Sequence, residues 1–514
     1  MSADTPSTAA MPGRAMVTLS VMLATTMQAI DTTIANVALP HMQGAMAATQ
    51  DQISWVLTSY IVSAAIMTPP TGFLAARFGR KRLFIIAVSG FVVASMLAGA
   101  AANLGQLVFF RLMQGAFGAS LVPLSQSVLL DIYPRHQHGR AIAIWGVGVM
   151  IGPVLGPTLG GWLTETLSWR WVFYINLPVG LMAITGLSLF VKRTYRQNKL
   201  PFDWPGFALL SLSIGALQMM LDRGQSQDWF SAPEIVMEAV LAVLCLYLFV
   251  VHIMTTRRPF LNPAMFKDRN LSMGLGFMFL VGIIFLSTMA ILPPFLQTLK
   301  GWPVILTGLV LAPRGLGMMM GMMIMGRLAE RFDPRLLIAG GLMMIVISLY
   351  AMSQFTLEVG QKEIIWTGFA QGLGLGSVFV PMGVITFATL DEKYRTEATA
   401  LFSLVRNLGS SIGVSISFAL LARNIQINHE EMAAHITLFN PLVKARALAG
   451  PIGLEQLALL DAQINQQAAM IGYLNDFRFM MAISLLAAPF ILLLRSPHKK
   501  DGPPLKMAPT KKGG

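Results

Sequence analysis

The chain has 514 residues, of which 55% are hydrophobic and only 12% are charged. Charged residues make up about a quarter of an ordinary soluble protein, so this composition excludes a soluble globular enzyme. A formal net charge of +13 would suggest nucleic acid as a partner in a soluble protein. Here the basic residues stand in short loops between apolar segments, which indicates membrane topology instead. The single cysteine, Cys245, excludes an intrachain disulfide.

Apolar segments of about 20 residues recur along the chain, and each is long enough to cross a hydrocarbon core of about 30 Å as a helix. They predict an all-α polytopic membrane protein with fourteen spans. The first six lie near 16–38, 55–75, 83–102, 106–130, 140–163 and 171–191, two more near 204–222 and 235–255, and the last six near 271–296, 304–326, 335–355, 364–389, 398–422 and 478–494.

The spans predict two six-helix bundles with two extra transmembrane helices between them. The expected parts are an N-terminal tail at 1–15, an N-terminal bundle at 16–200, two linker spans at 201–258, a C-terminal bundle at 259–496 with an outer loop at 423–477, and a C-terminal tail at 497–514. Lys and Arg, 37 in total, favour one side of these spans by about three to one. Because such residues collect on the cytoplasmic side, both termini are expected inside.

The expected outer loop at 423–477 is too long and too poor in Gly and Ser to be a simple linker. Within it, residues 454–467 have leucines and isoleucine at helical spacing, which predicts an amphipathic or coiled-coil-prone helix. Two interpretations stay open: the helix caps the outer face, or it forms a docking surface for a partner.

A short segment is repeated between the two halves of the chain. Gly72-Phe-Leu-Ala-Ala-Arg-Phe78 follows the second span of the first half, and Gly326-Arg-Leu-Ala-Glu-Arg-Phe332 follows the second span of the other. Both copies face the same side. The halves are therefore expected to be parallel repeats, as in one large class of transporters.

Ionisable side chains inside a span are costly and are therefore functional candidates. Asp31 is the one carboxylate clearly within an expected span, and Arg111 lies at a similar depth on span 4. Burial favours a neutral acid and a guanidinium favours the carboxylate, so a change in their contact would load or release a proton. The alternative is a static ion pair that locks the two helices together.

Other polar residues extend the possible pathway. Gln28 and Gln114 lie about one helical turn from Asp31 and Arg111, and they either continue the pathway or make hydrogen bonds between helices. Asn36 belongs to the same group. Arg314 and Arg406 have no acidic partner within their spans; each either lines an aqueous cavity, contacts an anionic substrate group, or bonds backbone carbonyls.

Span 5 carries a glycine at every fourth position, together with two prolines. Such a smooth face allows close approach of another helix, and the prolines favour a bend. The segment is a candidate pivot, with tight packing as the alternative, and comprises Gly148, Gly152, Pro153, Gly156, Pro157, Gly160 and Gly161.

Methionines are abundant, 35 in total, and several crowd into span 10 between Met318 and Met325. They suit a pocket that accepts many apolar shapes, although lipid-facing filler is the simpler interpretation. The sequence contains no metal-ligand cluster, P-loop or nucleophile elbow. We therefore expect no cofactor, no metal site and no enzyme activity, with protons as the coupling ion.

These residues resemble the major facilitator superfamily, and in particular its fourteen-span drug:proton antiporters of the EmrB/QacA type. The cytoplasmic loop motif of that family is similar to Gly72–Lys81, although Ala76 replaces its acid. The similarity extends to the first-span motif at Asp31–Pro40, the span 4 motif at Arg111–Gly118 and the antiporter motif at Gly152–Gly161. The loop-motif residues that match are Gly72, Arg77, Gly79, Arg80 and Lys81.

The resemblance implies a major facilitator fold in the inner membrane of a Gram-negative bacterium. It also implies proton-driven multidrug efflux of hydrophobic or amphipathic compounds, with Asp31 exchanging protons and Arg111 modulating it. The outer loop ending near Phe477 is similar to that of transporters that work with a periplasmic adaptor and an outer-membrane channel. Competing hypotheses are a dedicated exporter of one metabolite, lipid or siderophore and, from another class, a channel or receptor.

Overall fold

The computed structural model describes residues 13–192, 201–256, 259–436 and 454–495, and every regular element within these segments is a helix. The prediction of an all-α polytopic membrane protein is confirmed. Twelve helices of the described chain are long and apolar enough to cross a membrane, or up to 13 if one bent pair counts as a span. Fourteen spans are therefore not confirmed, because Gln28, Asp31 and several threonines lower the hydropathy of the first helix.

The N-terminal bundle follows the expected order, with some spans divided into two helices. The span near 55–75 is bent by 60° at Pro69 and Pro70, which supply no backbone N–H to continue the helix. The helices of the N-terminal bundle are α1 (Arg14–Ala45), α2 (Gln50–Met67), α3 (Thr71–Phe78), α4 (Arg80–Gly99), α5 (Leu104–Gly118), α6 (Leu121–Ile132), α7 (His138–Thr166), α8 (Trp171–Tyr174) and α9 (Asn176–Phe190).

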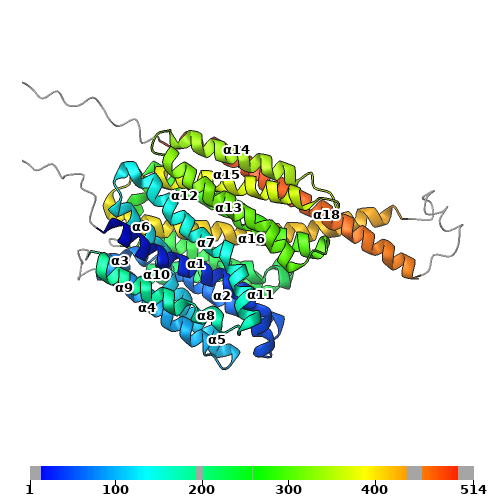
Figure 1. The fold of residues 1–514 in the computed structure, drawn as a ribbon, viewed down its shortest axis with the longest axis horizontal. Coiled ribbons are helices and arrows are strands. Elements are labelled where there is room, and N and C mark those ends of the chain that lie inside the picture. Colours follow the sequence, from blue (N-terminus) through cyan, green and yellow to red (C-terminus); the bar gives the residue numbers. More distant parts are fainter. Residues whose placement is uncertain (1–12, 193–200, 257–258, 437–453, 496–514) are drawn as a thin grey trace, which may run out of the picture.

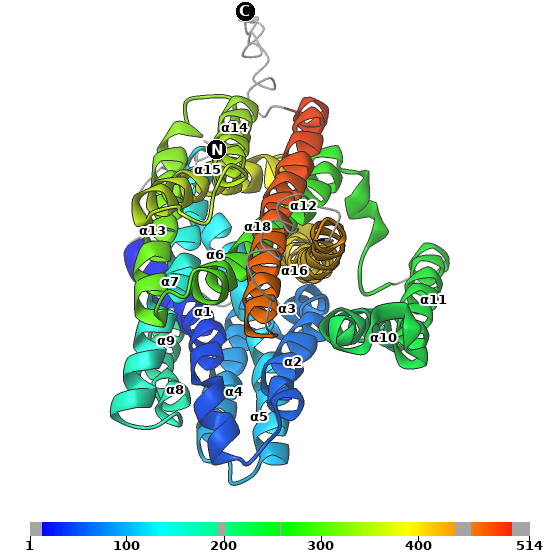
Figure 2. The same cartoon turned by 90° about the vertical axis from the view of Figure 1, so that its right-hand side faces the viewer.

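Two further helices, α10 (Trp204–Arg223) and α11 (Pro233–Thr255), form a hairpin beside the two bundles (Figure 2). Helix α10 packs against α2 of the first bundle and α16 of the second. Helix α11 packs mainly on α10, and its outer face exposes large apolar side chains such as Val243 and Met254, 70% and 77% exposed. Such a surface suits contact with lipid.

The C-terminal bundle comprises α12 (Arg269–Pro294), α13 (Val304–Leu328), α14 (Pro334–Met352), α15 (Gln361–Phe387), α16 (Arg395–Ala434) and α18 (Leu454–Ala487). One π-helical turn, η5 (Phe295–Leu299), continues α12. Short 3-10 turns complete the described chain: η1 (Arg135–Gln137), η2 (Gln225–Gln227), η3 (Trp229–Ser231), η4 (Pro263–Lys267), η6 (Glu392–Tyr394) and η7 (Ala488–Leu493).

Helices α16 and α18 project beyond the rest of the molecule at one end (Figure 1). Their 40 and 34 residues correspond to about 60 and 50 Å of helix at the standard rise, well beyond a hydrocarbon core of about 30 Å. The expected helix at 454–467 is therefore the start of α18 rather than a separate element. Much of the expected loop at 423–477 is helical, and residues 437–453 lie outside the described residues.

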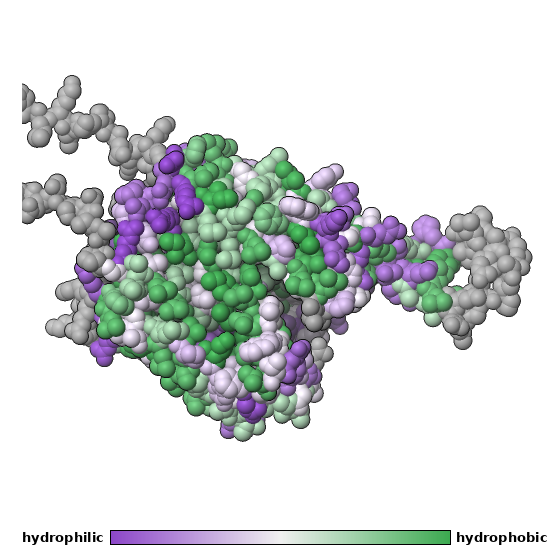
Figure 3. Space-filling model, in the orientation of Figure 1, coloured by the Kyte–Doolittle hydropathy of each residue, from purple (hydrophilic) through white to green (hydrophobic). Residues whose placement is uncertain are grey.

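The surface between the two ends is apolar. On the face shown in Figure 3, hydrophobic residues form a broad band, with hydrophilic residues gathered at either end. The bundles contact each other where α7 packs against α13 and α15, and where α3 and α6 pack against α16. This interface between the halves surrounds the cavity described below.

Candidate functional site

Asp31 and Arg111 form an ion pair inside the N-terminal bundle. One terminal nitrogen of the guanidinium donates to Oδ2 of Asp31 at 2.8 Å. The other carboxylate oxygen, Oδ1, accepts from Nε2 of Gln114 at 2.8 Å and from Nδ2 of Asn176 at 2.7 Å. Asp31 and Gln114 are 0% exposed and Arg111 is 1% exposed. The buried Asp31 carboxylate therefore accepts three hydrogen bonds from side chains of α5 and α9, and both of its oxygens are paired.

The donors are themselves held in place. The same guanidinium nitrogen of Arg111 donates to Oε1 of Gln114 at 2.8 Å, and its Nε donates to the backbone oxygen of Val56 at 3.2 Å. The Tyr60 ring lies 4.3 Å from the guanidinium carbon, at cation–π distance. Asn176 also donates to Ser95 at 2.9 Å. Five helices therefore fix the geometry around one carboxylate.

Glycines allow these helices to approach. A Cβ added to Gly115 on α5 would collide with the backbone oxygen of Tyr60 on α2. The same holds for Gly152 on α7 against the backbone oxygen of Ala29 on α1, two residues before Asp31. Since a larger side chain at either place would separate the helices, the small residues set the position of the pair.

The glycine face of span 5 packs against α1, within its own bundle. A Cβ on Gly148, Gly156 or Gly160 would also meet α1 side chains, whereas one on Gly161 would meet nothing within 4 Å. Thr26 and Thr33 of α1 donate to the backbone oxygens of Gly148 and Gly152 at 3.2 and 3.0 Å. The adjacent side of α7 contacts the other bundle. Pro153 lies on this side and lines the cavity described next.

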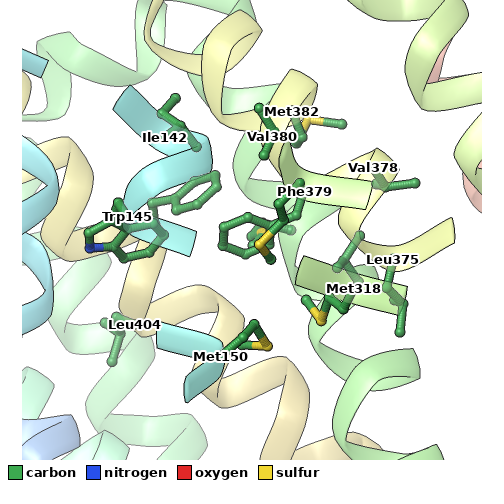
Figure 4. Packing of buried hydrophobic residues seen from close by; sticks show 14 of the residues in the cluster. Ile142, Trp145, Met150, Met318, Leu375, Val378, Phe379, Val380, Met382 and Leu404 are labelled. Carbon is green, nitrogen blue, oxygen red and sulfur yellow. The ribbon is translucent and has the colours of Figure 1, made fainter. Parts of the chain in front are cut away.

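A cavity lies between the bundles and adjoins α1 within one helical turn of Asp31. Gln28 and Thr32 of α1 line it, together with residues of α2, α6, α7, α12, α13, α15 and α16. Asp31 and Arg111 are not among its lining residues. Its wall is mostly apolar: Met150, Met318 and Phe379 lie close together where α7 meets α13 and α15, and Trp145 stacks on Phe379 at 5.7 Å (Figure 4).

The structure separates the other polar residues that the sequence singled out. Arg314 donates to the backbone oxygen of Phe285 at 3.0 Å and is 8% exposed. Arg406 lines the cavity. Gln28 also lines it and lies beside the hydroxyl of Tyr60, whose ring contacts Arg111. Asn36 is exposed and lies outside the Asp31 group.

The crowded methionines of span 10 have mixed surroundings. Met318 and Met322 are buried, and Met318 lines the cavity, whereas Met320 and Met323 are 42% and 49% exposed. Helical spacing explains this division, since alternate sides of α13 face the protein and the outside. Only part of the cluster is therefore placed to contact a bound molecule.

The loop motif closes one end of the interface. Asp131, at the end of α6, pairs with Arg80 of its own bundle and with Arg395 of the other. Gly72 packs so tightly that a Cβ would collide with Glu397 of α16, and Gly79 adopts a positive φ of 84°. Lys81 donates to the backbone oxygen of Ser188 at 2.6 Å, and Arg77 lies beside the Phe78 ring. Asp131 of α6 thus brings a carboxylate to Arg80 of the loop motif, in which Ala76 replaces the family's acid.

Two further hydrogen bonds join the bundles at the same end. Ser127 pairs with Thr396 at 3.0 Å, and Thr399 donates to the backbone oxygen of Pro123 at 3.2 Å. These two hydrogen bonds and the Asp131–Arg395 ion pair all join α6 to the beginning of α16. The interface is therefore closed at the end that carries the loop motif.

Sequence reasoning missed Asn176, Arg395 and Asp476. Asp476 is 0% exposed, and neither of its carboxylate oxygens has a hydrogen-bond partner among the described residues. Helix α18 includes Asp476, ahead of residue 478 where the last span was expected to begin, so Asp31 is not the only buried carboxylate on a long helix. The described residues include no group of three or more His, Cys, Asp or Glu placed to hold a metal ion.

Comparison with known proteins agrees with this arrangement. The family model described as Major Facilitator Superfamily matches residues 21–417. The chain belongs to the Major Facilitator Superfamily. It is 36% identical to the fatty acid resistance protein FarB of Neisseria gonorrhoeae over 499 residues, covering 95% of this chain and 97% of FarB.

The similarity extends to multidrug exporters and to a solved transporter fold. The multidrug export protein EmrB of Haemophilus influenzae is 34% identical over 488 residues, covering 94% of this chain and 96% of EmrB. These relatives place the chain in the EmrB-type branch of the superfamily. The proton:xylose symporter XylE, solved with a bound glucose derivative, shares the fold with a TM-score of 0.61 at 13% identity, covering 94% of this chain and 96% of XylE.

Proposed function

We propose that the chain is a proton-coupled multidrug exporter that moves hydrophobic or amphipathic compounds across the inner membrane by alternating access. The observation that carries the proposal is the buried Asp31–Arg111 pair next to a cavity between two bundles. A fully buried carboxylate is costly in a membrane protein unless it is paired. The presence of this costly buried pair beside the cavity supports a role in transport.

In the proposed mechanism, Asp31 exchanges the coupling proton. Protonation of its carboxylate removes the charge that holds Arg111, Gln114 and Asn176, so these contacts weaken together. The cavity residues Gln28 and Thr32 lie within one helical turn of Asp31 on α1. Movement of α1 therefore connects the protonation state with the shape of the cavity.

Alternating access requires that the closed end opens. The links between α6 and α16 at this end are few and polar, and include the Asp131–Arg395 ion pair and the Ser127–Thr396 hydrogen bond. They can therefore separate without exposing a large apolar surface. The glycine face of α7 against α1 supports a pivot within the N-terminal bundle. The alternative in which Asp31 and Arg111 form a static lock predicts that neutral substitutions affect stability but leave coupling intact.

The breadth of substrates follows from the apolar wall and from the relatives. EmrB of H. influenzae is named as a multidrug export protein, and flexible methionines such as Met150 and Met318 suit varied ligands. A second candidate is a dedicated exporter, favoured by the similarity to FarB, which is named for fatty acid resistance. Expression in a drug-sensitive host distinguishes them: resistance to unrelated compounds supports the first, and resistance to one compound class the second.

The projecting ends of α16 and α18 support a partner on the outer side. Leu457 and Leu459 are 47% and 60% exposed near the start of α18, where lipid does not cover them if the helix leaves the membrane. A periplasmic adaptor that leads to an outer-membrane channel would cover such side chains. The proposal puts both termini on the cytoplasmic side, opposite the projecting helices.

Inside-out vesicles test the proposal. A pH-sensitive dye reports the proton gradient, and the addition of a transported drug should cause proton efflux from vesicles with the native chain. Asp31→Asn should abolish that response. Asp222→Asn is the matched control, since Asp222 is an exposed acid that accepts from Thr58. Equal responses from native protein and Asp31→Asn would exclude Asp31 as the proton carrier.

A further inference from the structure

Among the described residues, Arg406 of α16 is the one positively charged residue that lines the cavity between the bundles. Phe285, Leu286 and Phe379 line the same cavity, and the described lining includes no carboxylate. The cavity encloses about 210 Å³, less than the roughly 300–1,000 Å³ of drug-sized ligand pockets, so a bound molecule requires the cavity to widen during transport. A permanent cation thus faces a mostly apolar space.

The guanidinium of Arg406 has donors to spare. Its only hydrogen bonds among the described residues go to Oδ1 of the adjacent Asn407, from Nε at 3.4 Å and from one terminal nitrogen at 3.3 Å. A guanidinium has five N–H donors in a planar fork. Arg314 differs, because it bonds the backbone oxygen of Phe285 and does not line the cavity.

The carboxylates of Asp31 and Asp222 are already engaged. Asp31 is held by three donors within the N-terminal bundle. Asp222 of α10 accepts from Thr58. An unpaired cation at membrane depth is costly, and a bound anion would offset that cost. Carboxylate, sulfonate and phosphate groups match the guanidinium fork in two-pronged geometry.

We propose that Arg406 binds the acidic group of an amphipathic anion, whose apolar body lies against Phe285, Met318 and Phe379. The inference rests on the proposed export function and specifies its substrate class. Ser403 and Ser410 lie one turn to either side of Arg406 on α16 and also line the cavity. The Ser403 hydroxyl has no hydrogen-bond partner among the described residues and provides a further donor to the same acidic group, whereas the Ser410 hydroxyl donates to the backbone oxygen of Gly282 at 3.1 Å.

The test compares ligands that share one apolar body. Binding of 11-(dansylamino)undecanoic acid and of its methyl ester is measured by dansyl fluorescence on the purified chain in detergent. Arg406→Gln should weaken binding of the acid by about tenfold or more, because a hydrogen bond to a charged group is lost, and should leave the ester within about twofold. Arg406→Lys should fall between, since it keeps the charge and loses the fork.

Ser410→Ala is the control variant, because Ser410 lines the same cavity on the same helix with its hydroxyl engaged by Gly282, and it should lower acid binding much less than Arg406→Gln. Equal losses of acid and ester in Arg406→Gln, or no loss of either, would overturn the inference. If Arg406→Gln does not fold, the affinities of the native chain for the two ligands test the proposal. The native chain should bind the acid at least about tenfold more tightly than the ester, and equal affinity for both refutes the proposal.

Failure of the inference and failure of the proposed function give different results. Proton-coupled transport of acid and ester at equal rates would keep the exporter and reject the role of Arg406. Acid binding that depends on Arg406, without coupled transport of any compound, would keep the binding site and reject the exporter.

Discussion

Removal of Arg111 from the buried pair should strongly destabilise the protein. In Arg111→Gln, the Asp31 carboxylate keeps its bonds to Gln114 and Asn176 but loses the guanidinium. Because both side chains of the pair are at most 1% exposed, water cannot replace the lost partner. Breaking a buried pair by removing one member costs about 3–5 kcal/mol, and we expect a loss in this range.

The double variant Asp31→Asn/Arg111→Gln should recover part of that loss, because it leaves no buried unpaired charge. The assay is the free energy of unfolding in mixed detergent micelles for the native chain, both single variants and the double variant. A coupling energy of about 2 kcal/mol or more between the two sites agrees with the structure. Additive effects of the two substitutions would refute the reasoning, since they would mean that the side chains do not interact.

Three further predictions concern the interface, the closed end and the projection. Gly152→Ala should destabilise the chain by about 1–3 kcal/mol through overpacking and should slow transport. Gly161→Ala places its methyl group in open space and should do neither. Equal thermal stability of the two variants would contradict the close packing of α7 on α1. Asp131→Asn should lengthen spin-label distances between the ends of α6 and α16, and unchanged distances would show that Asp131 does not hold this end closed. Leu457→Glu with Leu459→Glu should spare transport in vesicles and reduce resistance in cells; equal loss in both assays would indicate a structural role.

The sequence was sufficient for the bundle architecture and for the central pair. Apolar segment length indicates membrane helices, and a carboxylate and a guanidinium at similar depth indicate each other as partners because neither is stable alone in lipid. Asp31 and Arg111 lie 2.8 Å apart in the structure. Gln114 follows from its spacing, one turn after Arg111 on the same face.

Residues joined across long sequence separations were not predictable in the same way. Asn176 stands among apolar residues at the entry to span 6, and only the fold brings its amide to Asp31. Asp131 and Arg395 are 264 positions apart, and no periodicity relates them. The glycines of α7 indicated a close approach, but their pattern does not specify that α1 is the neighbour.

Boundary errors have a physical cause. Arg478 was taken to begin the last span, but its side chain is exposed on a helix that starts at Leu454 and continues into the membrane. Hydropathy marks where the lipid begins and not where the helix begins, so Asp476 was assigned to the loop. The same effect shortened α16, whose polar end continues to Ala434.

Proton release on substrate binding tests the central claim most directly. Purified chain is held in weakly buffered detergent solution with a pH-sensitive dye, and a compound that the vesicle assay identifies as transported is added. The account predicts proton release from the native chain and from Asp222→Asn, and none from Asp31→Asn with the compound still bound. Undiminished release from Asp31→Asn would contradict the claim that Asp31 carries the coupling proton.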